Sequence, residues 1–409
     1  MAEALSDKAI EIVKKTVPAL ESAGTAVTDR MYQLLFRNEE IRDLFNQSHH
    51  GESGSQSKAL TAAVIAYARN IDNLGVLGTR VERITQKHVG LHILPEHYHF
   101  VAEALLGAIK DVMGAAATDE VLKAWGEAYW FLADLLIARE AIIYSRLAAA
   151  DGGWNGWRDF GIESVAPESE VIRSFILVPA DGRHVMRHRP GQYLTFAFDQ
   201  VPGAGRLKRN YSISSGPESR AYRISVKREA RPGVRPGLVS NWLHDHARPG
   251  TVLKVAPPAG EFYLDEKDDS PVLLLSGGVG LTPMMSMLEA IVRSGSGRPA
   301  WYIHGAEHGR VHAMGVHTKQ LASQARNVTV RTFYNVPGPA DIAGQHYDER
   351  GLITAEWLRR NTPLDDAVSY ICGPRPFLRA MVGGLARTGV ALNRIRYEFF
   401  GPADELLAA

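Results

Sequence analysis

The feature that most constrains the fold of this chain is a change in hydrophobic periodicity along it. Residues 1 to about 148 repeat apolar positions at helical spacing and contain only two prolines, which predicts helix after helix. After Gly152 and Gly153, short alternating runs are separated by Pro/Gly turns, and from Pro271 apolar strands alternate with helical stretches. Since one core rarely grows beyond about 250 residues, three patterns in 409 residues predict several domains.

We therefore expect a multidomain fold. It comprises an all-α domain over residues 1–148, an antiparallel β domain over 154–266 and an α/β domain with a parallel sheet over 270–409. The β domain is expected to contain strands at residues 170–177, 193–198, 211–214 and 222–227, and the α/β domain strands at 272–275, 301–304 and 369–372.

Charge and composition exclude several classes of function. Lys+Arg 46 against Asp+Glu 45 leaves no general attraction to nucleic acid or anionic membrane, so a small-molecule or redox role is favoured. Cys372 is the only cysteine, which rules out an intramolecular disulfide and effectively excludes a cysteine-ligated zinc or iron–sulfur site. The N-terminus lacks a signal-peptide pattern and no apolar run reaches the ~18 residues of a membrane span, so we expect a cytoplasmic protein.

Three polar residues fall on apolar helical stripes of the first domain. His88 continues such a stripe, and Tyr98 starts the apolar face of a helix expected over residues 95–113, with proline at its first position. Glu140 occupies a position in a helix near residues 120–146 where the spacing demands a hydrophobic residue. A buried carboxylate needs a partner.

One arrangement satisfies all three residues. Glu140 and Tyr98 would hydrogen-bond one ring nitrogen of His88 while the other nitrogen binds iron. Such an imidazole is a stronger electron donor, which favours oxygen activation over oxygen carriage. The residues alone leave other interpretations open, because His88 and Tyr98 can be core residues and Glu140 can pair with Arg139 or Arg146.

The opposite side of such a site is less clear from the sequence. Gln56 lies one turn before Leu60 on an apolar stripe, so its amide should point inward. Tyr32 lies in a helix expected over residues 27–36, where the periodicity leaves its direction open. Phe45 either packs flat on a haem or has no special role. A purely structural role is equally open for Tyr32 and Gln56.

The β domain carries a combination of motifs that suits a flavin. Flavin binding needs a cation for the pyrophosphate, an aromatic plane and a hydrogen-bond donor, and Arg209, Tyr211 and Ser212 supply these within four residues. Tyr193 follows a Pro-Gly turn, and residues 237–246 open a helix whose free N–H groups suit a phosphate. Each motif alone is weak, since Tyr211 can be a surface aromatic of a strand, but the ordered set is much stronger.

The α/β domain carries glycines where a dinucleotide pyrophosphate would lie. Gly278, Gly280 and Pro283 form a G-x-G-x-x-P pattern between a buried strand and a helix. Cys372 ends a second strand before a helix, either beside the nicotinamide or as a small buried hydrophobe. We find no convincing acidic residue to bind the ribose 2′-hydroxyl after residues 301–304. Arg310 lies nearby instead, which hints at tolerance of a 2′-phosphate and slightly favours NADPH over NADH.

Residues 1–148 resemble the globin domain of flavohaemoglobins. The segments ITQKH, LPEHY and ARE, which end at His88, Tyr98 and Glu140, carry the resemblance. It implies that His88 binds the haem iron and that Tyr98 and Glu140 form a charge relay behind it. The remaining implied roles are oxygen binding by Tyr32 with help from Gln56, a pocket lining of Phe45 and Leu60, and tuning of haem–flavin electron transfer by Lys87.

The remainder of the chain resembles the ferredoxin-reductase superfamily, which implies a β-barrel FAD domain and a Rossmann-like NAD(P) domain. A C-terminal YEFFGP motif adds an aromatic lid, Phe400, and a residue between flavin and haem, Glu398, while Phe399 replaces a cysteine expected in some relatives. The implied flavin contacts are Tyr193, Arg209, Asn210, Tyr211, Ser212, Val239, Ser240, Glu398, Phe399, Phe400, Gly401 and Pro402. The implied nucleotide contacts are Gly278, Val279, Gly280, Leu281, Thr282, Pro283 and Cys372.

The resemblance covers essentially the whole chain and implies a nitric oxide dioxygenase. NADPH or NADH would reduce one FAD, which reduces one haem b, and the ferrous-oxy haem would convert nitric oxide and oxygen to nitrate. The alternatives are an oxygen-sensing or oxygen-storing globin with a self-reducing flavin module, and a flavin or ferric reductase. We expect a monomer with no nucleic-acid partner, and the sequence leaves open whether lipid occupies the haem pocket.

Overall fold

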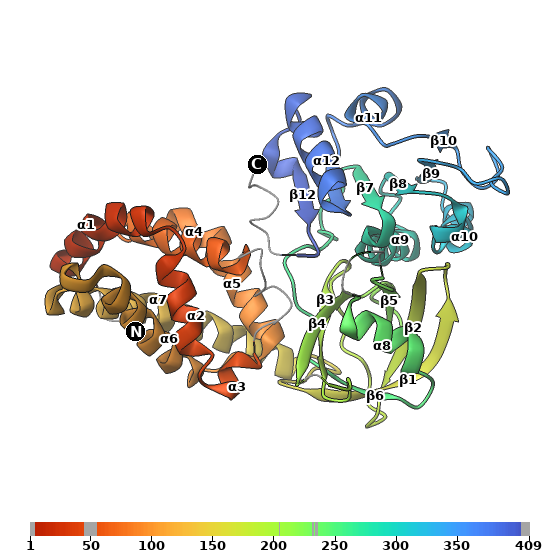
Figure 1. Ribbon diagram of the computed structural model, residues 1–409. Helices are drawn as coiled ribbons and strands as arrows, with labels where there is room; N and C mark the ends of the chain where they lie inside the picture. The colour runs from red at the N-terminus through yellow and green to blue at the C-terminus, as the bar shows by residue number, and fades with distance from the viewer. Residues whose placement is uncertain (1–4, 45–54, 204, 231–232, 234–235, 402–409) are drawn as a thin grey trace. The chain divides into compact units, whose positions relative to one another are not determined.

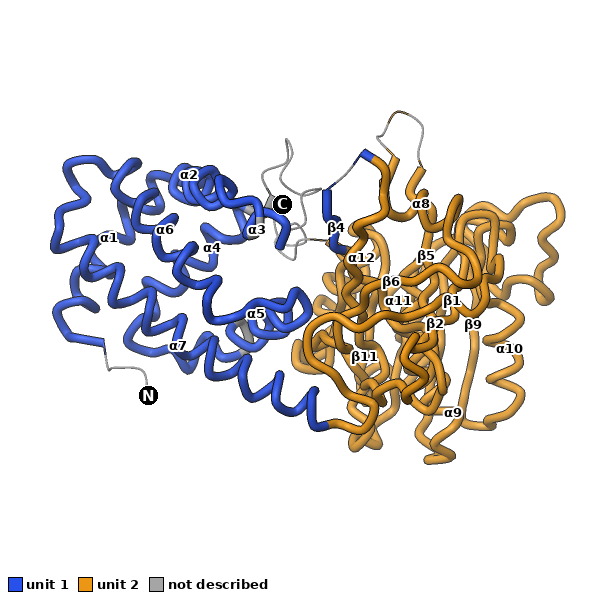
Figure 2. Tube along the Cα trace, turned by 90° about the horizontal axis from the view of Figure 1, so that it is seen from below, with its two compact units in different colours: residues 1–149, 203–208, 402–409 blue, residues 150–202, 209–401 orange. Residues whose placement is uncertain are grey.

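The computed structural model describes residues 5–44, 55–203, 205–230, 233 and 236–401. They form two compact units (Figure 2). The first contains the N-terminal part of the chain up to Ala149, together with the short segment 203–208, and the second contains the rest up to Gly401. The change from helical to alternating periodicity therefore coincides with the change from one unit to the other.

The first unit is helical, and local chemistry fixes several helix ends. The Ser6 side chain accepts the Ala9 N–H at the start of the first helix. Gly114, with φ 53°, ends α6 in the left-handed region that favours glycine. No helix among the described residues has an apolar stretch long enough to cross a bilayer. The helices are α1 (Asp7–Ala23), α2 (Ala26–Leu35), α3 (Glu39–Arg42), α4 (Ser55–Arg69), α5 (Gly78–Leu91), α6 (His97–Met113) and α7 (Asp119–Ala149).

The core of the helical unit is apolar, and the buried polar side chains that the structure describes in it are paired. Helix α2 packs on α6, and α7 packs on α1, α5 and α6. The indole N–H of the buried Trp125 donates to the Thr16 hydroxyl at 3.1 Å, and the Tyr67 hydroxyl donates to the Ala128 carbonyl at 2.7 Å. Because α7 is shared by three neighbours, its side chains can meet residues of α5 and α6.

One helix boundary in this unit differs from the sequence prediction. Helix α6 begins at His97, so the preceding Pro95 is not its first residue but belongs to a turn. In that turn the His97 Nδ1 accepts the Leu94 N–H at 2.9 Å. Leu77 ends a short 3-10 helix, and α5 starts at Gly78 and continues beyond His88 to Leu91.

The second unit begins with an antiparallel six-stranded sheet in the order β4-β3-β6-β1-β2-β5. An isolated bridge joins Ile213, just after β4, to Ile224 of β5, which closes the sheet into a barrel. Two predicted strands are displaced: the Ser169 hydroxyl accepts the N–H groups of Val171 and Ile172 in a turn that delays β2, and β4 starts earlier than expected. The elements are β1 (Arg158–Pro167), β2 (Ile172–Pro179), β3 (Tyr193–Phe198), β4 (Leu207–Ser212), β5 (Tyr222–Lys227), α8 (Leu238–His246) and β6 (Val252–Val255).

The chain then forms a second sheet of six strands, all parallel, in the order β10-β9-β8-β7-β11-β12. The order reverses at β7, so the crevice beyond the carboxyl ends of β7 and β11 is the topological switch point, where such sheets bind ligands. Helices α9 and α10 lie on one side of this sheet and α11 and α12 on the other (Figure 1). The elements are β7 (Val272–Gly277), α9 (Leu281–Ser294), β8 (Ala300–Ala306), α10 (Gly315–Gln324), β9 (Val328–Tyr334), β10 (Glu349–Arg350), α11 (Ala355–Asn361), β11 (Val368–Cys372), α12 (Arg375–Arg387) and β12 (Ile395–Glu398).

The barrel and the parallel sheet share one apolar core. Barrel residues Ile172, Phe262 and Leu264 belong to the same buried cluster as the apolar side chains of α9 and of the parallel strands. Burial of a common core makes separation of the two layers costly, which accounts for their presence in a single unit.

Candidate functional site

His88, Tyr98 and Glu140 meet at one point of the helical unit, each contributed by a different helix. His88 comes from α5, Tyr98 from α6 and Glu140 from α7. Glu140 Oε1 accepts the Tyr98 hydroxyl at 2.7 Å and lies 2.8 Å from His88 Nδ1, which is itself 3.0 Å from the Tyr98 oxygen. Glu140 is 2% exposed, so its carboxylate depends on these two partners rather than on water.

This geometry fixes which histidine nitrogen can bind a metal. A carboxylate at Nδ1 holds the ring proton there and leaves the Nε2 lone pair as the donor. Burial and the neighbouring Glu140 charge raise the pKa of Tyr98, so its hydroxyl stays protonated and donates. An imidazole with one nitrogen engaged and the other available is the donor set that an axial haem ligand requires, and these residues therefore fit a haem.

The alternative pairings of Glu140 are not found among the described residues. Arg139 instead donates through Nε to Glu82 of α5 at 2.9 Å. Two further tyrosines, which the sequence reasoning missed, support the trio. The Tyr129 hydroxyl donates to the Tyr98 carbonyl and the Tyr144 hydroxyl to the Ile93 carbonyl, both at 2.7 Å. Both lie at helical spacing from Glu140, which was the available signal.

The opposite side of the expected haem pocket is only partly described. Tyr32 of α2 and Leu60 of α4 are partly buried against the helical core. Burial and Asp29 raise the pKa of Tyr32 to about 12, so its hydroxyl is protonated at neutral pH and can donate. Phe45 and the Gln56 side chain lie outside the described residues. The exposed Lys87 directly precedes His88 on α5.

The predicted flavin residues of the RNYS segment lie on and alternate along β4. Burial raises the pKa of Tyr211 and lowers that of Arg209. The Tyr211 ring packs edge-on against Phe196 at 5.7 Å between centroids. Ser212 is buried at the end of the strand, while Asn210 points to solvent. One strand thus carries a cation, an aromatic ring and a hydroxyl, as a flavin requires.

Tyr193, at the start of β3, lies near residues far away in the sequence. A Cβ on Gly260 would lie 2.9 Å from a carbon of the Tyr193 ring, so only glycine fits at this position. Burial raises the pKa of Tyr193, and the charge of Glu398 at the end of β12 adds to this. The expected flavin contacts of the barrel and of the C-terminal motif are therefore neighbours.

Helix α8 and the C-terminal motif supply the other expected flavin contacts. Gly237, the N-cap of α8, has no side chain to accept the first N–H groups of the helix, which suits a phosphate. Val239 and Ser240 are buried in its first turn, and the Ser240 hydroxyl donates to the Gly237 carbonyl. Phe400, the predicted aromatic lid, is 47% exposed.

The end of the C-terminal motif is described as far as Gly401. The Arg375 guanidinium lies 5.9 Å from the centre of the Phe399 ring. A Cβ on Gly401 would come within 2.6 Å of that same ring, so this glycine permits the chain to pass it. Pro402 lies outside the described residues.

The nucleotide motif lies at the switch point of the parallel sheet. Gly280 packs on the turn after β11: a Cβ there would be 2.2 Å from the Cys372 oxygen and 2.7 Å from the Gly373 nitrogen. Gly278 has φ 53°. Close backbone packing at the carboxyl ends of two adjacent strands is the cradle that a dinucleotide pyrophosphate uses. Val279 precedes α9, and the buried Leu281, Thr282 and Pro283 form its first turn.

Cys372 and Glu398 end adjacent strands in the same register. Cys372 is fully buried, and burial, together with the Glu398 charge, raises the pKa of its thiol. The neutral thiol is thus a small apolar group beside the nucleotide turn, which agrees with both interpretations of this residue.

An acidic residue at the end of β8 was missed in the sequence. The strand extends to Ala306, two residues further than predicted, and Glu307 follows it directly. The Asn335 side chain, which follows β9, donates to the Glu307 carboxylate at 3.2 Å. Arg310, which hinted at tolerance of a 2′-phosphate, lies 3.4 Å from Glu170 at the surface. Glu307 was missed because the predicted strand was ended at the last strongly apolar residues.

Together these features define a class of protein. A helical domain with a carboxylate-oriented histidine is followed by a barrel suited to a flavin and a parallel sheet suited to a nicotinamide nucleotide. The chain is thus a haem-type domain joined to an oxidoreductase module. Residues 28–136 match the globin family and residues 274–383 the oxidoreductase NAD-binding domain family.

Comparisons with known proteins give the family. The chain is 50% identical to a flavohemoprotein of Xylella fastidiosa over 409 residues, 100% of both chains. A flavohemoglobin structure from Malassezia yamatoensis with bound FAD and heme has the same fold, with a TM-score of 0.85 at 23% identity over 98% of this chain and 100% of that one. The FAD/NAD-binding domain of a Vibrio cholerae nitric oxide dioxygenase is 34% identical, with a TM-score of 0.55 over 61% of this chain and 100% of that one. The chain belongs to the flavohemoprotein family.

Proposed function

We propose that this protein is an NAD(P)H-dependent nitric oxide dioxygenase containing one haem b and one FAD. When bound, the nucleotide would supply a hydride, the flavin would supply transfer of the two electrons one at a time, and the haem iron would supply the oxygen activation needed to convert nitric oxide to nitrate. The hydrogen bond between Glu140 and His88 Nδ1 carries the proposal, because a strongly donating imidazole suits oxygen chemistry rather than oxygen carriage.

Different residues of the described chain would hold the haem, the FAD and the nucleotide. His88 would bind the haem iron through Nε2, with Leu60 at the pocket wall. Arg209 would face the FAD pyrophosphate, Tyr193 and Tyr211 would contact its ring system and Ser212 would donate to it. The nucleotide would lie on the turn between β7 and α9 that contains Gly280. Within the helical unit, Glu140 keeps the ring proton of His88 on Nδ1. Tyr98 holds that carboxylate in place, and Tyr129 in turn donates to the backbone carbonyl of Tyr98.

Aerobic consumption of nitric oxide by the purified, haem- and FAD-loaded protein with NAD(P)H tests the proposal. We expect stoichiometric formation of nitrate. An oxygen-storage globin would bind oxygen without consuming nitric oxide, and a flavin or ferric reductase would reduce added flavin or iron faster than it consumes nitric oxide. Consumption at background rate with both cofactors bound would reject the dioxygenase.

Tyr32→Phe is expected to make oxygen leave the reduced protein faster. The Tyr32 hydroxyl, protonated because burial raises its pKa to about 12, is proposed to donate to the bound oxygen. A hydrogen bond to a charged or polarised group contributes about 1.5–3 kcal/mol, so the rate should rise roughly ten- to hundredfold. Flash photolysis measures the rate. Tyr67→Phe, which removes only a bond to the Ala128 carbonyl, serves as control, and equal rates in both variants would remove Tyr32 from this role.

Glu307→Gln is expected to increase the use of NADPH relative to NADH by about tenfold, ~1.4 kcal/mol. We propose that this carboxylate, at the end of β8, accepts the ribose hydroxyls of NADH and repels a 2′-phosphate. The ratio of kcat/KM for the two nucleotides measures the effect. Arg310→Gln tests the earlier prediction: if this variant loses NADPH activity and Glu307→Gln changes nothing, Arg310 rather than Glu307 selects the nucleotide.

The partners and location follow from the same proposal. Oxygen and nitric oxide are the substrates, no nucleic acid is bound, and the protein works in the cytoplasm as a monomer. Sedimentation at working concentration tests the monomer, and lipid extraction from the purified protein establishes whether the haem pocket holds a lipid.

A further inference from the structure

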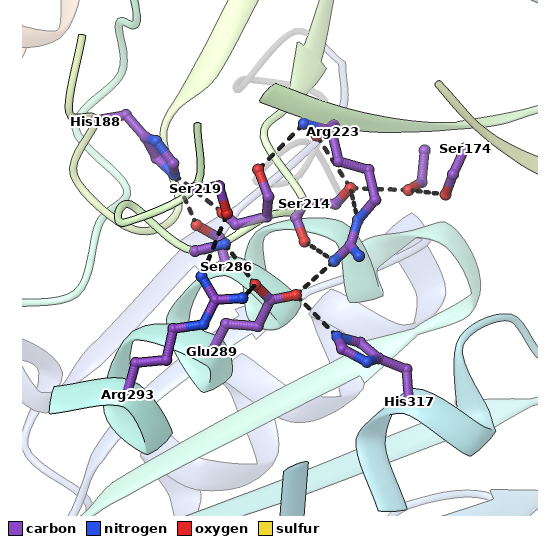
Figure 3. Close-up of polar contacts among 12 residues, drawn as sticks. Ser174, His188, Ser214, Ser219, Arg223, Ser286, Glu289, Arg293 and His317 are labelled. Atoms are coloured by element: carbon purple, nitrogen blue, oxygen red, sulfur yellow. Dashed lines mark hydrogen bonds and ion pairs between the residues drawn. The ribbon is translucent and has the colours of Figure 1, made fainter. Parts of the chain in front are cut away.

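Helix α9 carries a stripe of polar residues that form hydrogen bonds with the flavin barrel. Its first turn belongs to the nucleotide motif, whereas Ser286, Glu289 and Arg293 recur at spacings of three and four residues further along the same helix. Each of them contacts the barrel (Figure 3): the Ser286 hydroxyl meets His188 Nε2 at 3.0 Å, and Arg293 donates to the Ser219 hydroxyl at 3.3 Å. The helix that presents the nucleotide turn is thus also bound to the barrel by polar contacts.

Glu289 is the centre of this stripe and is 2% exposed. Its Oε1 accepts from Arg223 at 2.7 Å and from His317 Nε2 at 2.9 Å. Its Oε2 accepts the Gly216 N–H at 2.8 Å and lies 3.3 Å from Arg293. Burial alone would raise the pKa of Glu289, but the bonds from His317, Arg223 and Gly216 outweigh it and lower the pKa to about 2. One ionised carboxylate therefore joins the barrel, α9 and α10.

One barrel partner of Glu289 lies in the loop that follows β4, the strand that carries the expected flavin contacts and is called the flavin strand below. Gly216 follows Ser212 of β4 by four residues, and a Cβ at Gly216 would lie 3.0 Å from the Glu289 Cβ. Arg223, on β5, also donates to both the carbonyl and the hydroxyl of Ser214 in that loop. The Ser214 hydroxyl in turn contacts Ser225, which contacts Ser174 (Figure 3). The loop is therefore held from the barrel side and from α9 at once.

From these contacts we infer that Glu289 is a positioning residue for hydride transfer. It holds the loop after the flavin strand against α9, the helix that begins at the nucleotide turn. The inference rests on the proposed use of FAD and NAD(P)H. In that step the C4–H bond of the nicotinamide breaks and an N–H bond forms on the flavin, which oxidises the nucleotide and reduces the flavin by two electrons. Misplacement by about 1 Å can slow such a step about a hundredfold.

Anaerobic stopped-flow reduction of the loaded protein by NADH tests this role with E289Q. The amide offers one acceptor oxygen and an NH₂ group to four donors, so some of the four contacts must be lost. We expect the limiting rate of flavin reduction to fall at least tenfold, with the apparent Kd for NADH within twofold of wild type. Reduction by dithionite, which needs no nucleotide geometry, should be unchanged. Hydrogen exchange at the Gly216 amide should be faster before any NADH is added.

The matched control is E356Q, which removes an exposed carboxylate paired with Arg360 in the same domain and should behave as wild type in every measurement. If E289Q does not accumulate, the same measurements are made on Arg223→Gln. This variant removes one of the four groups that contact the Glu289 carboxylate, and that group belongs to the barrel. Faster amide exchange with an unchanged limiting rate would overturn the inference, as would a rise in Kd at unchanged limiting rate. Since flavin reduction precedes any use of oxygen or nitric oxide, the result is independent of whether nitric oxide is the substrate.

Discussion

Replacing Glu140 by Gln is expected to slow nitric oxide consumption roughly 10–100-fold while haem stays bound, the usual effect of altering a group that orients a metal ligand. The amide keeps the shape and can still accept the Tyr98 hydroxyl, but it removes the negative charge 2.8 Å from His88 Nδ1. The imidazole then donates less electron density. Steady-state turnover and the iron–histidine stretching frequency in the reduced protein measure the two effects, and both should decrease.

Glu82→Gln is the matched control for this prediction. Glu82 lies on α5 with His88 and accepts from Arg139, the residue beside Glu140. It has no contact with the histidine ring among the described residues, so its loss should change neither turnover nor the stretching frequency. A Glu140→Gln protein with wild-type turnover would show that the carboxylate is structural, and the case for oxygen chemistry over oxygen storage would lose its main support.

Gly280→Ala is expected to raise the KM for the nicotinamide nucleotide at least tenfold and to lower stability. The new Cβ would lie 2.2 Å from the Cys372 oxygen and 2.4 Å from its carbonyl carbon, both of them backbone atoms. Overpacking costs typically about 1–3 kcal/mol even where side chains can move, so the nucleotide turn must separate from the turn after β11. Initial rates of flavin reduction over a range of NADH, together with thermal unfolding, measure the effect.

Gly295→Ala separates stability from binding. Gly295 ends α9 with φ 62° and has nothing within 4 Å of its added Cβ. That variant carries only the backbone strain of a left-handed residue, about 1–2 kcal/mol, and should keep the wild-type KM. If Gly280→Ala also kept the wild-type KM, the close packing of the two turns would have no part in nucleotide binding.

Local patterns located most of the candidate haem site. Glu140 was noticeable because a carboxylate stood where helical spacing required an apolar residue, and its burial follows from the position alone. The same spacing contained Tyr129 and Tyr144, but an aromatic residue on an apolar stripe looks like ordinary core, and only their hydroxyl contacts distinguish them. Glu307 was missed for another reason, since strand ends are weakly marked when glycine and alanine replace bulky residues.

Local patterns in the sequence were enough to predict the order of the three folds, the helical faces that carry His88, Tyr98 and Glu140, and the glycines of the nucleotide turn. Periodicity and backbone freedom are properties of neighbouring residues. The tertiary structure alone decided that Glu398 lies near Tyr193, and that Glu289 accepts from Gly216 and Arg223. These partners are 66 to 205 residues apart, and no local pattern records which strand or helix packs against which. A buried carboxylate predicts that it has partners, and only packing identifies them.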